Sequence, residues 1–370
     1  MNTSIRTLIV LLLFAATSLT SKTEAGIPLV KIASVRVGDP GNAADTTGYG
    51  AVADVFHMGK YEVSISQYTA FLNAVAATNA NSYIVNLWHP QMADNNNIKG
   101  ISRTGLGTTA QPYVYTVLGG GSRPITYVSW FDAARFVNWM HNGATNGADT
   151  ETGAYTLNGA TSGLITKNPG ARWWIPNENE WHKAAYYKGG SANAGYWLYP
   201  TKSDSAPGNI VGSSPHQANY YNGVYSTTQG NQNSGQDFLT AAGSFSGSPG
   251  PYGTFDQAGN VWEWADVPNA TSAQRVRRGG NWSGGAPNLL FSFRDATNPD
   301  NEDPFGGFRV ASVPLAALWL TIEAVPDLSS VPWRPKPVNK DDVADDGRIY
   351  FGVVTNTNLF YRLKLVLEPQ

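Results

Sequence analysis

Residues 252–267 read YGTFDQAGNVWEWADV, and this stretch decides how the whole chain is interpreted. Asp256, Asn260 and Glu263 bring three oxygen-bearing side chains into one tight turn, flanked by two tryptophans. Hard oxygen donors, backbone carbonyls included, are the ligands that calcium takes, so a calcium-binding turn is one interpretation. An aromatic core strand with an Asx-type turn is the other, and the spacing alone leaves both open.

The next stretch, residues 277–296, reads RRGGNWSGGAPNLLFSFRDA. Its four glycines would let the backbone approach a ligand or another segment closely. No cysteine or histidine lies in it, and no lysine follows the glycines as it does in a phosphate-binding loop. We interpret Arg294 and the later Arg309 as packed cations with buried partners rather than as catalytic groups.

Outward from these two stretches, three runs have helical spacing, and each starts at a residue suited to a helix N-terminus. They begin at Ser64 or Ser66, at Ser129, and at Pro176, and the last two end at Gly143 and at Gly189-Gly190. Strand patterns predict a hairpin with a long loop over 30–55, a strand over 56–63 and a short strand pair within 79–123. Residues 189–253 are almost aperiodic, so a metal or ligand is expected to hold them.

The two ends of the chain have their own character. Residues 1–25 carry Arg6, a short apolar run and small residues near the end, which predicts a secretory signal peptide and export or a periplasmic location. No later segment is long and apolar enough to span a membrane. Residues 315–370 alternate like strands in LWLTIEAV, RIYFGVV and FYRLKLVLE, so we expect a small β appendage behind a proline-rich linker.

The composition narrows the chemistry. Aromatic residues make up 12% of the 370 residues and charged residues only 14%, which is typical of a loop-rich fold pinned by aromatic packing. A net charge of −2 gives no reason to expect nucleic-acid binding. With no cysteine, thiol nucleophiles and thiolate metal sites are excluded. The five histidines have no ligand spacing, although a site that assembles them in three dimensions stays open.

Six segments occur in one order along the chain: MGKYEVSISQYTAFLNA, PITYVSWFDAARFVNWM, WWIPNENEWHKAAYYKGG, GTFDQAGNVWEWADV, RVRRGGNWS and FGGFRVAS. Together they resemble the sulfatase-modifying-factor family, the formylglycine-generating enzymes and their relatives, over roughly residues 28–314. The resemblance implies an irregular, loop-rich α+β fold of the C-type-lectin kind, which we assign to residues 26–314.

The same resemblance implies two structural calcium ions that anchor the aperiodic region. The first ion would take the side chains of Asp256 and Glu263 and the carbonyls of Gly259 and Val261. The second would take the side chains of Asn219 and Asp237 and the carbonyls of Tyr220 and Leu239.

The family's catalytic chemistry needs two cysteines just after the RGG strand, where a copper-bound thiolate pair activates oxygen. The matching positions here are Gly284 and Leu289, so no catalytic residue and no copper are expected. The stretch would then be an active-site segment without its chemistry. A groove around it would bind a peptide, glycan or protein ligand through Asn281, Trp282, Ser283, Asn288, Arg294 and Asp295.

Two functions from different classes therefore remain. The first is a secreted, calcium-stabilised binding or scaffold module that does not oxidise cysteine. The alternative is an oxidoreductase of the formylglycine-generating or non-haem-iron sulfoxide synthase superfamily, although the histidines that such iron enzymes need are scattered here.

Overall fold

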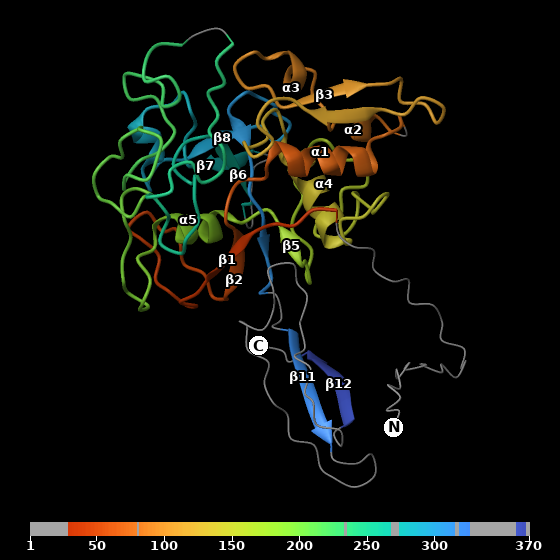
Figure 1. The fold of residues 1–370 in the computed structure, drawn as a ribbon. Coiled ribbons are helices and arrows are strands. Elements are labelled where there is room, and N and C mark those ends of the chain that lie inside the picture. The colour runs from red at the N-terminus through yellow and green to blue at the C-terminus, as the bar shows by residue number, and fades with distance from the viewer. Residues whose placement is uncertain are drawn as a thin grey trace, which may run out of the picture.

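The computed structural model describes residues 29–79, 81–232, 235–267 and 274–314, and the backbone of residues 318–325 and 360–367 (Figure 1). The signal peptide predicted at 1–25 and the strand-like run at 348–354 lie outside these residues. The fold is a mixture of short helices and small sheets joined by long loops, as the sequence predicts.

The helices are α1 (Ile65–Val75), α2 (Ser82–Val85), α3 (Gln91–Asp94), α4 (Trp130–His141) and α5 (Glu178–Tyr186), with a 3₁₀ turn, η1 (Ala286–Leu289). The strands are β1 (Ser34–Val37), β2 (Phe56–Gly59), β3 (Ile101–Thr104), β4 (Val114–Val117), β5 (Trp173–Trp174), β6 (Trp262–Ala265), β7 (Arg275–Arg278), β8 (Asp295–Thr297), β9 (Gly306–Gly307), β10 (Ala311–Ser312), β11 (Leu318–Val325) and β12 (Phe360–Leu367).

The three longest helices each start with a reciprocal capping box. Ser64 caps α1, Ser129 caps α4 and Asn177 caps α5, and in each the third helical residue bonds back to the cap. Of the two serines that the sequence offered as the N-cap of α1, Ser64 is the cap in the structure. For α5 the predicted limits were wrong at both ends: Pro176 precedes the cap, and the helix stops at Tyr186, before the two glycines.

Two four-stranded sheets organise the domain, with strand orders β1-β2-β10-β5 and β8-β7-β6-β9. The predicted hairpin with a long loop is present, but its second strand lies just beyond the predicted range: β1 pairs antiparallel with β2, and residues 38–55 form the loop between them. The strand pair expected within 79–123 is β3 with β4, but the sequence missed α2 and α3.

The core surrounds α4, which packs against α1 (Figure 1). Residues 130–140 of this helix are buried without exception. Phe136 makes edge-to-face contacts with Phe71 and Phe308, with both ring centroids 5.4 Å away, and stacks on Tyr68 at 6.2 Å. Such aromatic pairs supply much of the burial that a loop-rich fold needs.

Between α5 and β6, the described residues contain no helix or strand. This stretch is held instead by isolated bridges within it, such as that between Asn219 and Gly259, and by contacts to distant segments, such as the bond from the Ala242 amide to the Ser122 carbonyl. At the other end of the chain, β11 and β12 form an antiparallel two-stranded sheet. In the described part of the chain, no helix has both the length and the apolarity needed to cross a bilayer.

Candidate functional site

The second sheet brings together the two stretches that the sequence singled out. β6 carries the WEWA run and β7 carries RVRR, and the two strands pair antiparallel with Glu263 opposite Arg278. Residues 279–294 then loop away from β7 and return as β8, with η1 in the middle. All side chains of β6 and β7 are buried, so the strands form a packed base below this loop.

Glu263 makes a buried ion pair with Arg309. The guanidinium contacts both carboxylate oxygens, at 2.5 Å from Nε and 2.6 Å from Nη2, and neither side chain is exposed. The indole Nε1 of Trp181 donates to the same carboxylate at 2.7 Å. Glu263 therefore does not fit as a calcium ligand, because its oxygens are already occupied by an arginine and a tryptophan.

Two further acids lie in the same buried cluster. Burial foremost raises the pKa of Asp256 to about 6, although one of its oxygens accepts the Gly243 amide. Burial, and then the charges of Asp256 and Glu263, raise the pKa of Glu62 well above its usual value. The Oε1 atom of Glu62 is buried and has no hydrogen-bond partner. Of these three carboxyl groups, only Glu263 contacts the Arg309 guanidinium, so Asp256 and Glu62 suit an added cation while Glu263 does not.

An arginine side chain also contacts the residues predicted to bind the second calcium ion. Arg123 contacts the Asp237 carboxylate at 3.1 Å and donates to the Leu239 carbonyl at 2.9 Å. The amide of Asn219 donates to neighbouring oxygens, and the carbonyl of Tyr220 accepts from Asn209 and Ser226. Arg123 therefore supplies the positive charge here, and this set does not fit calcium.

The polar residues predicted to line a groove are largely engaged inside the protein. The Asn281 side-chain oxygen accepts the amides of Ser283 and Gly284, which fixes the turn after β7. Trp282 is buried and stacks on Phe238 with ring centroids 5.1 Å apart. Asn281 and Trp282 therefore serve packing rather than offering a surface to a ligand.

The two charged members of that predicted set are paired. Arg294 holds Glu178 through two contacts of 2.7 and 2.9 Å, and Asp295 accepts from Arg277 at 2.7 Å. Asn288, in η1, is half-buried beside Gly284. Arg294 thus has the buried partner that the sequence predicts, but its own side chain is 38% exposed rather than packed in the core.

Gly284 and Leu289, the two positions at which the sequence resemblance predicts the family's cysteines, differ in their surroundings. Gly284 is half-buried, and a Cβ atom there would lie 2.7 Å from the side-chain oxygen of Asn288. Leu289 is fully buried in an apolar cluster with Tyr199, Tyr220 and two alanines. Neither position offers an accessible polar group.

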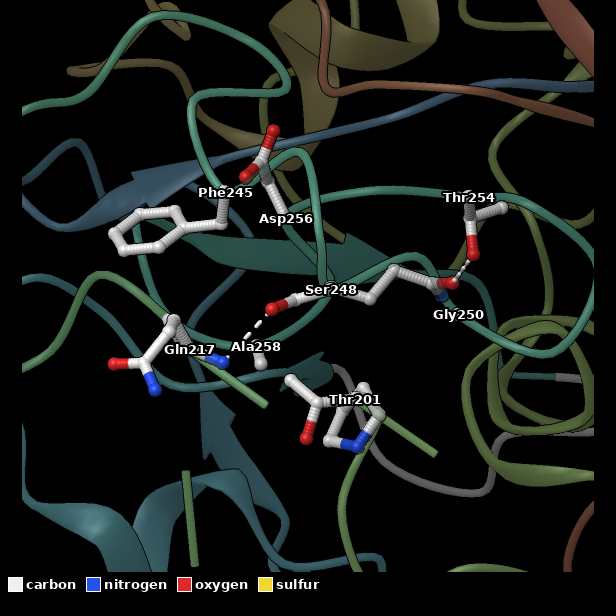
Figure 2. A pocket seen from close by; sticks show the side chains of 11 residues that line it. Thr201, Gln217, Phe245, Ser248, Gly250, Thr254, Asp256 and Ala258 are labelled. Atoms are coloured by element: carbon white, nitrogen blue, oxygen red, sulfur yellow. Dashed lines mark hydrogen bonds between the residues drawn. The ribbon is translucent and has the colours of Figure 1, made fainter. Parts of the chain in front are cut away.

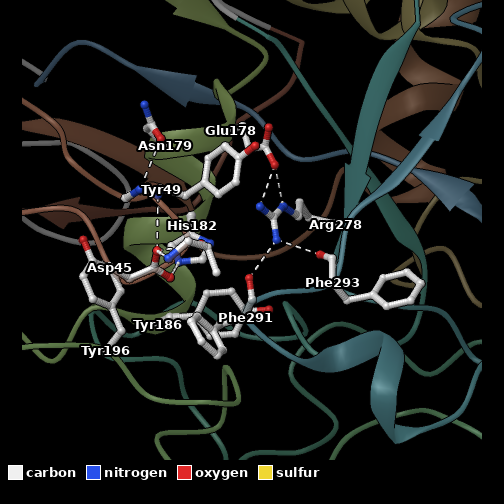
Figure 3. Close-up of polar contacts among 12 residues, drawn as sticks. Asp45, Tyr49, Glu178, Asn179, His182, Tyr186, Tyr196, Arg278, Phe291 and Phe293 are labelled. Atoms are coloured by element: carbon white, nitrogen blue, oxygen red, sulfur yellow. Dashed lines mark hydrogen bonds and ion pairs between the residues drawn. The ribbon is translucent and has the colours of Figure 1, made fainter.

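Around Glu178, the structure assembles a polar cluster that the sequence did not predict (Figure 3). Arg278 and Arg294 both contact the Glu178 carboxylate, and the ring of Tyr49 lies 5.0 and 5.2 Å from the two guanidinium carbons. Arg278 also donates to backbone carbonyls of the loop before β8. This network ties α5, β7 and the residue 38–55 loop together.

His182 and Asp45 form the second half of that cluster (Figure 3). His182 Nε2 lies 2.8 Å from an Asp45 carboxylate oxygen, and four aromatic rings surround the imidazole. Burial lowers the pKa of His182, although the hydrogen bond to Asp45 acts in the opposite direction. For Asp45, burial would raise the pKa, but the hydrogen bonds from His182 and Thr47 outweigh it and lower the pKa to about 2. His182 is thus a buried group that fastens the residue 38–55 loop through Asp45.

A small polar cavity lies beside Asp256 (Figure 2). Ser248 accepts the Gln217 amide at 2.8 Å at its edge, and the Thr201 hydroxyl is buried without a partner. The cavity volume is about 10 Å³, room for one water molecule. It is too small for a substrate.

A larger cleft opens where the first sheet meets the N-terminus of α5, and its volume is about 540 Å³. It is lined by residues 51–56, 167–171, Trp174, Asn177, Asn179, Glu180, Val313 and Pro314. None of the groove residues predicted from the sequence lies in this lining. Much of its wall comes from the loops at 51–55 and 167–171, and no sequence pattern predicted that these loops would meet β5 and α5.

The five histidines do not assemble a metal centre. Among the described residues, no group of three or more histidine, aspartate or glutamate side chains is placed to hold a metal ion. His89, for example, stacks on Tyr127, while His216 contacts the Thr201 carbonyl. The five histidines therefore occupy separate parts of the fold.

Comparison with known proteins adds family information to this geometry. Residues 34–313 match the model of the sulfatase-modifying factor enzyme 1-like domain. The chain is similar to the formylglycine-generating enzyme of Thermomonospora curvata, with 24% identity over 317 residues that cover 75% of this chain and 90% of the relative.

Similar solved structures were also found. CarF matches at 22% identity over 77% of this chain and 99% of its own, with a TM-score of 0.43. Treponema denticola variable protein 1 matches at 17% identity over 78% and 97%, with a TM-score of 0.43. PvdO from Pseudomonas aeruginosa matches at 17% identity over 76% and 92%, with a TM-score of 0.38.

Proposed function

The chain belongs to the sulfatase-modifying factor enzyme 1-like family, and from this premise we propose that it is a ligand-binding member that does not oxidise cysteine. One observation carries the proposal. The chain contains no cysteine at all, and the residues that the resemblance places at the family's thiolate positions are Gly284 and Leu289, the second fully buried among apolar side chains. A thiolate is the reacting ligand in that chemistry, and neither side chain can supply one.

The binding part of the proposal rests on the cleft of about 540 Å³. This volume falls within the range of pockets that hold small molecules or a few residues of a peptide or glycan. A groove built from Asn281, Asn288, Arg294 and their neighbours receives less support, since most of these side chains already have partners. The proposed ligand site is therefore the 540 Å³ cleft.

Calcium remains part of the proposal only for the first set. Asp256 and Glu62 would face the ion, because their cluster holds more carboxyl groups than Arg309 can balance. The ion would neutralise this buried charge and fasten residues 240–260 to the end of β2. Export also remains a proposal, supported by Arg6 and the apolar run of residues 8–16.

A peptide assay tests the catalytic part. The purified chain is incubated, with and without copper, with a cysteine peptide of the sulfatase type, and the Thermomonospora curvata enzyme serves as the positive control. We expect mass spectrometry to find the aldehyde only in the control. The double variant Gly284→Cys/Leu289→Cys should stay inactive, because a buried side chain and a contact to Asn288 occupy these positions. Aldehyde formed by the unmodified chain would overturn the proposal.

A further inference from the structure

The residues that line the 540 Å³ cleft include the Trp174 ring and the buried carboxyl group of Glu180, which together we call its floor. Trp174 and Glu180 expose only 5% and 7% of their surfaces. The indole Nε1 of Trp174 donates to Glu180 Oε2 at 2.8 Å, and the Asn177 amide donates to the same oxygen at 2.8 Å. These bonds fix the ring and the carboxylate relative to each other, so the floor is rigid.

A cation from the protein's own chain lies on this floor. The Lys167 ammonium is 4.1 Å from the centroid of the Trp174 ring, the distance of a strong cation–π contact. Burial raises the pKa of Glu180, and the charge of Lys167 acts in the opposite direction. Lys167 itself is an exposed residue on the residue 160–170 loop, so its side chain can move away from the Trp174 ring.

We propose that this floor is a seat for an organic cation, which Lys167 fills in the free protein, and that a ligand bearing a primary ammonium group binds the cleft by displacing Lys167. The proposal rests on the ligand-binding role proposed above and names its chemistry. Tryptophan is the best aromatic partner of a cation, and a buried carboxylate beside it adds direct attraction.

The remaining lining favours the same class of ligand. Asp54 and Glu180 are the acids of the lining, and Lys167 is its one cation, so displacement of Lys167 leaves Glu180 without the positive charge that acts on it. Asn177 and Asn179 also line the cleft; their carboxamide oxygens accept the Glu180 and Gly50 amides, and each oxygen keeps a second lone pair for a ligand. A ligand amine would find charge at the floor and hydrogen-bonding groups along the wall.

Binding of n-butylammonium chloride to the full chain tests the proposal by calorimetry and tryptophan fluorescence. The variant Lys167→Ala empties the seat and should bind this probe on the order of tenfold more tightly than the unmodified protein. Lys167→Arg keeps a cation on the ring and should bind like the unmodified protein. Lys188→Ala is the matched control, because Lys188 lies 4.4 Å above Trp197 outside the cleft.

A second variant separates the carboxylate from the ring. Glu180→Gln, made in the Lys167→Ala background, keeps the side-chain oxygen that caps α5 but removes the charge. It should abolish the gained affinity while the melting temperature stays close to that of the single variant.

Three outcomes would overturn the proposal. Lys167→Ala would bind no more tightly than the unmodified protein, or the neutral probe 1-pentanol would bind as well as the amine. In the third, pentanoate would bind the unmodified protein and be lost in Lys167→Ala, which would make Lys167 an anchor for anions. The two experiments are independent. If the amine does not bind, the result of the cysteine-peptide assay still stands, and if an aldehyde forms in that assay, the amine-binding result still stands.

Discussion

At the scale of single residues, the most unusual pair is Asp132 with Glu302. Their carboxyl groups share a hydrogen bond at the N-terminus of α4. Burial, and then the Asp132 charge, raise the pKa of Glu302 to about 9. Because the folded protein holds this proton more tightly than the unfolded chain, the pair favours folding below the unfolded pKa near 4.5, and that contribution is lost as the pH rises toward 9.

The variant Glu302→Gln should therefore stabilise the protein at alkaline pH. The amide keeps a donor for Asp132 and carries no charge that must be neutralised. We expect a melting temperature roughly 2–4 °C above that of the unmodified protein at pH 8, and a difference that shrinks as the pH approaches 4. The control Asp94→Asn removes a carboxylate at an exposed position of α3. An equal shift in both variants, or no pH dependence, would contradict the shared proton.

A separate prediction concerns calcium binding by the buried acids near Arg309. If calcium balances Asp256 and Glu62, chelation should lower the melting temperature by roughly 5–10 °C at a calcium concentration near 100 times the Kd. Asp256→Asn should remove this response. Glu263→Gln should instead destabilise by about 3–5 kcal/mol with or without calcium, because it leaves Arg309 uncompensated. A melting curve that ignores both calcium and chelator would rule the ion out.

At the scale of elements, the parts that the sequence predicted well are those with local causes. The starts of α1 and α4 follow from a cap and a residue three positions later, within one turn of chain. The site was harder to predict because its partners are remote. Arg123 lies 116 residues before Leu239, and Asp45 lies 137 residues before His182. No spacing rule connects such pairs, so the calcium and groove assignments could not anticipate the guanidinium groups.

The local signal at α1 gives a direct test. Ser64 satisfies the Gln67 amide at the start of the helix, whereas Ser66 is exposed within it. Ser64→Ala should lower the free energy of unfolding by about 1 kcal/mol, the usual effect of a lost N-cap. Ser66→Ala is the matched control and should have little effect. Equal losses in urea titrations of the two variants would show that the cap is not the source.

At the scale of the whole molecule, the sequence predicts a boundary near residue 314. The paired strands β11 and β12 come after it, and the two larger sheets are built entirely from earlier residues. A chain limited to residues 26–314 should therefore unfold in one cooperative transition, with a melting temperature within a few degrees of the full chain. Calorimetry measures both. A molten or insoluble product would mean that the last strands belong to the main core.

The position of β10 affects how this chain folds while the ribosome synthesises it. β10 lies between β2 and β5 in the first sheet, although about 250 residues separate it from β2 in the sequence. At ribosomal speeds of 5–20 residues per second, roughly 10–50 s pass between the emergence of the two strands. During that interval one edge of β2 has no strand beside it, and an unpaired edge invites pairing with other chains. Nascent chains of this protein should therefore need protection by a chaperone until the last residues of the sheet have left the ribosome.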